Sequence, residues 1–181
     1  VSRSGDDAFE FFGGTVNGKY LIAHNTYDDD FDTDFGFQGK IQFGLVKRDP
    51  NFADVSGSNG FESDNDATGS TNSPQTNPTF SNMTVVGPIQ NAGDVINVNY
   101  KRGAHLRRNT NTDIFNSVII GYPSGIMVDG ALCEASATAN SLKVQNSIIA
   151  GHNNDFEVAV GSSFDANAWF TTAAYNNSIL D

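Results

Sequence analysis

The sequence predicts an all-β protein, a right-handed single-stranded parallel β-helix (a solenoid) of about six or seven coils. Three observations lead to this prediction: a repeat of acidic residues around phenylalanine, a repeat headed by asparagine, and a scarcity of helix-favouring segments. Gly, Asn, Ser and Thr recur every few positions along the 181 residues and interrupt any 3.6-residue pattern. Short strands joined by polar turns therefore fit the chain best.

The acidic repeat fills the N-terminal third of the chain. Residues 6–10 (DDAFE) return 22 residues later as 28–32 (DDDFD), and residues 60–64 (GFESD) are a looser third copy. Side chains alternate along a strand, so we expect the phenylalanines to point inward and Asp30, Asp32 and Asp34 to face solvent. Neighbouring coils lie about 4.8 Å apart. The inward rings should then form one stacked column of Phe9, Phe31 and Phe61.

The asparagine repeat fills the C-terminal half. Residues 82–87 (NMTVVG), 116–121 (NSVIIG) and 146–151 (NSIIAG) share one template, and 177–180 (NSIL) begins it again. Such periods of about 21 to 34 residues suit stacked coils, whereas a propeller blade needs at least about 40. Since Asn tolerates the left-handed backbone of a tight turn, we expect a turn column. Its members are Asn82, Asn116, Asn146 and Asn177.

We predict a single β-helix domain over residues 1–181, as a fragment of a longer chain, because the repeat continues on both sides of each polar stretch. Excursion loops are expected near 56–78 and 131–141. The N-terminus has no signal-peptide character, and no apolar run approaches the roughly 18 residues of a membrane-spanning helix.

Charge and cysteine content exclude several classes of function. Asp and Glu number 21 against 10 Lys and Arg, which gives a formal net charge of −11. This excess repels phosphate and anionic lipid, so we expect no nucleic-acid partner and no membrane insertion. The lone Cys133 excludes an internal disulfide framework. His24, His105 and His152 share no zinc-ligand spacing.

Acidic residues gather in columns when the coils are placed in register. Glu10, Asp32 and Glu62 share one outward column and Asp34 and Asp64 the next. Carboxylates this close repel by about 1 kcal/mol per pair in water and more near a protein surface. Oxygen ligands at this density suit Ca²⁺, the one cofactor we expect. The candidate metal ligands are Asp6, Asp7, Glu10, Asp28, Asp29, Asp30, Asp32, Asp34, Glu62 and Asp64.

A solvated acidic face or a ladder of salt bridges is the competing interpretation of the same columns. Leu106 and Arg107 align on Phe61 and Glu62, which places Arg107 next in the acidic column. In that arrangement arginine, rather than a metal ion, supplies the positive charge.

Three runs of the sequence carry a family resemblance: residues 4–17 (SGDDAFEFFGGTVN), 28–36 (DDDFDTDFG) and 56–66 (SGSNGFESDND). They resemble secreted or cell-surface parallel β-helix proteins of Bacteroidetes, many of which carry a type IX secretion sorting domain. The resemblance continues through residues 116–121 and covers nearly the whole chain. It implies a secreted or cell-surface location, with further coils of the parent chain as neighbours, and no particular biochemical role.

Together these observations favour a non-catalytic module, stabilised by Ca²⁺, that serves adhesion, glycan binding or a structural role with a glycan or cell-surface partner. The alternative is a polysaccharide lyase or glycoside hydrolase acting through Asp32, Asp34, Glu62 and Arg107, because a lyase needs carboxylates to hold Ca²⁺ and a basic residue as base. A further set of aromatic residues either stacks on sugars or belongs to the core. These are Tyr100, Tyr122, Trp169, Phe170 and Tyr175.

Overall fold

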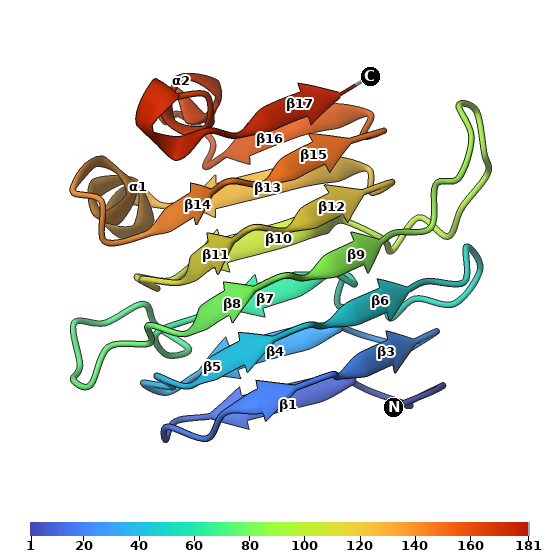
Figure 1. The fold of residues 1–181 in the computed structure, drawn as a ribbon, viewed down its shortest axis with the longest axis horizontal. Helices are drawn as coiled ribbons and strands as arrows, with labels where there is room; N and C mark the ends of the chain where they lie inside the picture. Colours follow the sequence, from blue (N-terminus) through green and yellow to red (C-terminus); the bar gives the residue numbers. More distant parts are fainter. Residues whose placement is uncertain (181) are drawn as a thin grey trace.

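The computed structural model describes residues 1–180 and is a parallel β-helix, which confirms the predicted fold class. Each of the first five coils gives one strand to each of three parallel sheets, and sheet 1 lies behind sheets 2 and 3 in Figure 1. Sheet 1 contains β1 (Phe9–Phe12), β4 (Phe31–Asp34), β7 (Phe61–Ser63), β10 (Arg102–Arg107), β13 (Ser124–Asp129) and β16 (Asn154–Val158).

Sheets 2 and 3 follow sheet 1 in every complete coil. Sheet 2 contains β2 (Gly18–Lys19), β5 (Lys40–Gln42), β8 (Thr79–Ser81), β11 (Asp113–Phe115) and β14 (Lys143–Gln145). Sheet 3 contains β3 (Ile22–His24), β6 (Leu45–Lys47), β9 (Thr84–Val86), β12 (Val118–Ile120), β15 (Ile148–Ala150) and β17 (Ser178–Leu180). In the sixth coil α2 (Ala166–Phe170) and a 3₁₀ turn, η1 (Ala173–Tyr175), connect β16 to β17.

The predicted phenylalanine column lies inside the helix. Phe9, Phe31 and Phe61 are paired in register on β1, β4 and β7. Their ring centroids are 5.3 and 5.8 Å apart, and both pairs are stacked. Phe31 and Phe61 are fully buried. The ring spacing is close to the separation of neighbouring strands, so one residue type repeated once per coil builds this part of the core.

The asparagine column also forms, with one member corrected. Asn82, Asn116 and Asn146 have left-handed backbones with φ of 57°, 50° and 52°. The fourth member is Asn176 (φ 53°), whose Nδ2 donates to Asn146 Oδ1 at 3.1 Å, so the prediction of Asn177 is wrong by one residue. The pairing of Ser178 with Ile148 sets this register, because it brings Ile179 inward beside Ile149.

The excursions from the coils differ in part from the predicted loops. The strand β7 lies within 56–78, and long connections leave on either side of it, between β6 and β7 and between β7 and β8 (Figure 1). The segment 131–141 leaves the coil as the helix α1 (Ala131–Thr138), not as a loop. Its alanine-rich sequence favours a helix, and Cys133 and Ala137 are buried. No helix within residues 1–180 is long and apolar enough to cross a membrane.

Candidate functional site

The outer face of sheet 1 carries the predicted acidic column. Glu10, Asp32 and Glu62 are paired in register on β1, β4 and β7, one position after the inward phenylalanines. Their side chains therefore point outward. Asp7 comes from the turn before β1, and its Oδ1 accepts a hydrogen bond from the backbone N–H of Asp29 at 2.8 Å. This bond fixes Asp7 beside the neighbouring coil.

Five carboxylates at the N-terminal end of this face form two overlapping groups. Asp6, Asp7 and Asp28 each offer an oxygen within 4.8 Å of the others, and so do Asp7, Glu10 and Asp32. We call these five residues the acidic cluster. Within residues 1–180 none of them forms an ion pair with Lys, Arg or His, whose salt bridges involve other carboxylates. The cluster therefore lacks a compensating positive charge from the described chain.

Two oxygens of the acidic cluster have no hydrogen-bond donor. Asp28 Oδ1 and Asp32 Oδ1 are both shielded from solvent and have no partner among residues 1–180. The other oxygen of Asp28, Oδ2, accepts from Ser56 Oγ at 2.7 Å. A buried carboxylate oxygen without a partner costs free energy. A bound cation would compensate for it.

The environment of the cluster opposes ionisation. Burial raises the pKa of Asp32 to about 8, and the negative charges of Asp7 and Glu62 add to the effect. Burial also raises the pKa of Asp7 to about 7, against the lowering effect of the bond from Asp29. The pKa of Asp28 is raised chiefly by burial as well. In the absence of a cation Asp7 and Asp32 thus retain protons near neutral pH.

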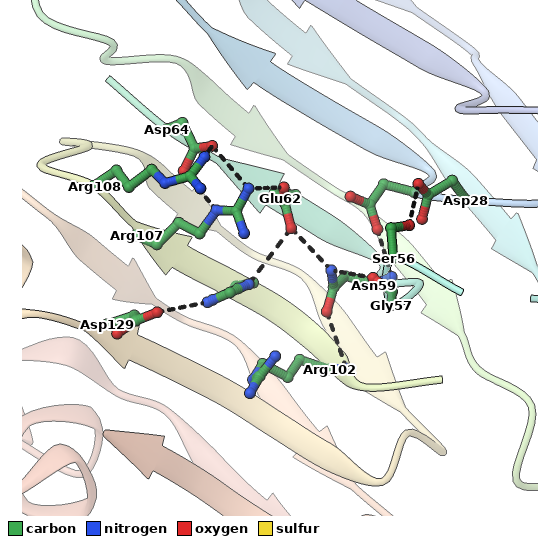
Figure 2. Close-up of polar contacts among 12 residues, drawn as sticks. Asp28, Ser56, Gly57, Asn59, Glu62, Asp64, Arg102, Arg107, Arg108 and Asp129 are labelled. Carbon is green, nitrogen blue, oxygen red and sulfur yellow. Dashed lines mark hydrogen bonds and ion pairs between the residues drawn. The ribbon is translucent and has the colours of Figure 1, made fainter. Parts of the chain in front are cut away.

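The C-terminal half of the same face is neutralised by arginine (Figure 2). Arg107 forms an ion pair with Glu62, and its Nε donates to Asp64 Oδ1 at 2.7 Å. Arg108 Nη1 lies 2.9 Å from Asp64 Oδ2. His105 lies between two carboxylates, 3.4 Å from Glu62 Oε2 and 2.9 Å from Asp129 Oδ2. For Glu62 and Asp64 the structure therefore has the predicted salt-bridge ladder.

Arg107 enters this ladder two residues away from its predicted position. Ala104, not Leu106, pairs with Phe61, so His105 stands beside Glu62 and Arg107 is level with Asp64. Gly103, the residue before Ala104, is closely packed, since a Cβ there would lie 2.3 Å from the side chain of Ile119. Arg107 still reaches Glu62 diagonally.

Asp30 does not face solvent, and that prediction is wrong. It is fully buried and receives hydrogen bonds from Thr26 Oγ1 at 2.7 Å and from the Tyr122 hydroxyl at 3.3 Å. Arg48, also buried, places its Nε 3.3 Å from Asp30 Oδ2. Asp30 precedes β4 and lies outside the strand, so strand alternation does not govern its direction. Its partner Arg48 was not foreseen, since no sequence pattern links the two.

Two further predicted ligands belong to neither group of close oxygens. Asp29 is 4% exposed and accepts the backbone N–H of Asn59 at 2.5 Å. Burial, together with the negative charges of Glu62, Asp28 and Asp7, raises the pKa of Asp29. Asp34 accepts from the backbone N–H of Phe35 at 2.6 Å and belongs to neither group of close oxygens. Of the ten predicted ligands, five thus form the acidic cluster and five have other surroundings.

Arg107 has little freedom to act as a base in the lyase alternative. Burial lowers its pKa, but the hydrogen bond to Asp64 and the charge of Glu62 outweigh burial and raise it. A guanidinium held this way keeps its proton. Of the four residues of that alternative, Asp32 belongs to the acidic cluster, while Glu62 is paired with Arg107.

The aromatic residues singled out in the sequence belong to the core. Tyr100, Tyr122, Trp169, Phe170 and Tyr175 are all buried. The exposed rings are others, which hydrophobicity alone predicts to be buried: Phe12, Tyr20, Phe35, Phe43 and Phe52.

Comparison with known proteins identifies one family. The family described as a pectate-lyase-like β-helix domain matches residues 1–179. No curated protein and no solved structure matches the chain significantly.

Proposed function

We propose that the chain, which belongs to the family of pectate-lyase-like β-helix domains, is a non-catalytic β-helix module that binds Ca²⁺ through its acidic cluster. The module serves adhesion, glycan binding or a structural role, at the cell surface or after secretion. The observation that supports this proposal is the set of five carboxylates without a partner cation, two of them with buried, unbonded oxygens.

Calcium suits this site better than the other common divalent ions. It accepts six to eight oxygens in flexible geometry, whereas Mg²⁺ demands a near-ideal octahedron and Zn²⁺ prefers nitrogen and sulfur ligands. The acidic cluster offers only carboxylate oxygens, from two neighbouring coils and the turns that precede them. An ion there would tie the first coil to the second and remove the repulsion between them.

Calorimetric titration tests the proposal directly. Asp7 and Asp32 keep protons near neutral pH, so Ca²⁺ binding should release them. The titration is run at pH 7.5 in two buffers of different ionisation enthalpy, with Mg²⁺ in a parallel run. We expect saturable Ca²⁺ binding, an apparent enthalpy that depends on the buffer, and weaker binding of Mg²⁺. Absence of saturable Ca²⁺ binding would refute the metal site.

A further inference from the structure

The corner between sheets 2 and 3 turns on one left-handed residue in each of the five complete coils. The backbone N–H of Tyr20 donates to Gln42 and that of Phe43 to Ser81, so the two rings occupy the column that continues in asparagine. The φ angles agree along the column. They are 57° at Tyr20, 59° at Phe43, 57° at Asn82, 50° at Asn116 and 52° at Asn146.

Tyr20 and Phe43 are unfavourable residue types for the left-handed backbone conformation at this corner. Asn tolerates a left-handed conformation, whereas a bulky residue there is an outlier. The two rings gain little burial in return, since Tyr20 is 73% and Phe43 42% exposed. They stack on each other with centroids 5.3 Å apart and planes at 9°. The fold alone gives no reason to prefer them to asparagine.

The rings are part of a wider apolar surface. Ile22 and Leu45 follow two residues later, are paired in register on β3 and β6, and are 53% and 43% exposed. We call Tyr20, Ile22, Phe43 and Leu45 the aromatic corner. In the third coil the same two positions carry Asn82 and Thr84, so the apolar surface is confined to the first two coils.

The charge around the aromatic corner is opposite to that of the chain as a whole. The strands β2, β3, β5 and β6 contain no Asp or Glu, although the chain has 21. They carry Lys19, Lys40 and Lys47, none of which forms an ion pair within the described residues. The corner between β5 and β6 faces the front in Figure 1, with sheet 1 behind.

We propose that the aromatic corner binds a linear glycan that carries acidic groups. The apolar face of a sugar ring would stack on Tyr20 and Phe43, and the acidic groups would meet the three lysines. This inference deepens the glycan-binding role within the proposed function and rests on it. It uses no residue of the acidic cluster, so the two sites fail or succeed separately.

Two soluble cellulose derivatives test the proposal, because they share one backbone and differ in charge. Carboxymethyl cellulose is anionic and hydroxyethyl cellulose is neutral. Affinity electrophoresis of the whole chain should show binding to the first, and binding at least tenfold weaker to the second. The preference should fall as salt rises, since Lys contacts to carboxylates are screened.

The column itself supplies the matched variant. Tyr20→Asn combined with Phe43→Asn installs the residue that the later coils carry, so folding and Tm should be kept while binding falls at least tenfold. The control is Phe12→Asn with Phe35→Asn, a second exposed pair of rings, with centroids 5.4 Å apart and planes tilted by 37°. This control should bind as the unaltered chain does. Lys19→Gln, Lys40→Gln and Lys47→Gln together should remove the preference for the anionic derivative.

Three results would overturn the proposal: no binding of carboxymethyl cellulose, undiminished binding by the folded asparagine variant, or tighter binding of a single-stranded oligonucleotide than of the glycan. The affinity electrophoresis is repeated in chelator, and its result is compared with that of the Ca²⁺ titration. Retained glycan binding without a Ca²⁺ response would refute only the metal site, whereas a Ca²⁺ response without glycan binding would refute only the aromatic corner.

Discussion

Asp7 and Asp32 belong to neighbouring coils, yet their carboxylate oxygens lie within 4.8 Å of each other and of Glu10. Neither residue has a basic partner among residues 1–180. In the third coil, next to that of Asp32, Glu62 and Asp64 are each held by arginine. In one half of this outer face arginine side chains therefore neutralise the carboxylates. In the other half only protons or a metal ion can do so.

The first prediction concerns pH in the presence of chelator. The folded-state pKa is about 7 for Asp7 and about 8 for Asp32, against 3.8 for an ordinary Asp. Between these values the folded state holds more protons than the unfolded state, so stability falls as pH rises. We expect Tm in chelator to fall from pH 5 to pH 9. A Tm that rises over this range would show that the cluster does not hold these protons.

Calcium should reverse this dependence. The metal binds deprotonated carboxylates, so its stabilising effect should grow as pH rises through 7 and 8. Thermal unfolding at pH 6 and pH 8.5, with and without Ca²⁺, measures the difference. A Ca²⁺ effect of equal size at both pH values would indicate binding outside the acidic cluster.

The variants Asp32→Asn and Asp34→Asn test which column holds the metal. Both remove one negative charge from β4, but only Asp32 belongs to the acidic cluster. In chelator at pH 8.5 we expect Asp32→Asn to raise Tm by a few degrees, because it removes the repulsion between carboxylates. With Ca²⁺ in place of chelator, the same variant should lose most of the rise in Tm that the ion gives the unaltered chain. Asp34→Asn should keep that response. Equal losses in the two variants would contradict the assigned ligands.

The buried pair of Arg48 and Asp30 should be a strong determinant of stability. Arg48→Met leaves the carboxylate of Asp30 buried without its cation, which costs about 3 to 5 kcal/mol. The double variant Arg48→Met with Asp30→Asn should recover part of this loss, because no charge then remains unpaired. Urea unfolding of the single and double variants gives the coupling. An Arg48→Met variant as stable as the unaltered chain would show that the pair contributes nothing.

The asparagine column gives a prediction for backbone conformation. Asn116→Ala places a Cβ without a polar group at φ 50°, which should cost about 1 to 2 kcal/mol. Asn116→Gly has no Cβ and should cost less, although it also loses the side-chain bond to Asn82. Urea unfolding compares the two variants. A glycine variant less stable than the alanine variant would assign the column's role to its side-chain bonds.

Sequence alone predicts the features that repeat once per coil. Phe31 and Asp32 follow from strand alternation, because a one-residue slip would turn every side chain to the other face. The sequence does not predict residue positions that depend on a single local feature of the structure. Arg107 is displaced because Ala104, not Leu106, pairs with Phe61, and Asp30 turns inward because it precedes its strand. Tyr20 escapes prediction for the opposite reason, since an exposed ring contradicts the usual burial of aromatic residues.

Thermal unfolding at pH 8, once with Ca²⁺ and once with chelator, tests the central claim most directly. An ion bound only by the folded state stabilises it by about 2.7 kcal/mol at a hundredfold excess over its Kd. For a chain of this length that corresponds to a rise in Tm of roughly 5 to 10 °C. We predict such a rise for Ca²⁺, a smaller one for Mg²⁺, and only a small remainder of the rise for Ca²⁺ with Asp32→Asn. An unchanged Tm would contradict the calcium site and assign the carboxylates of the acidic cluster to protons alone.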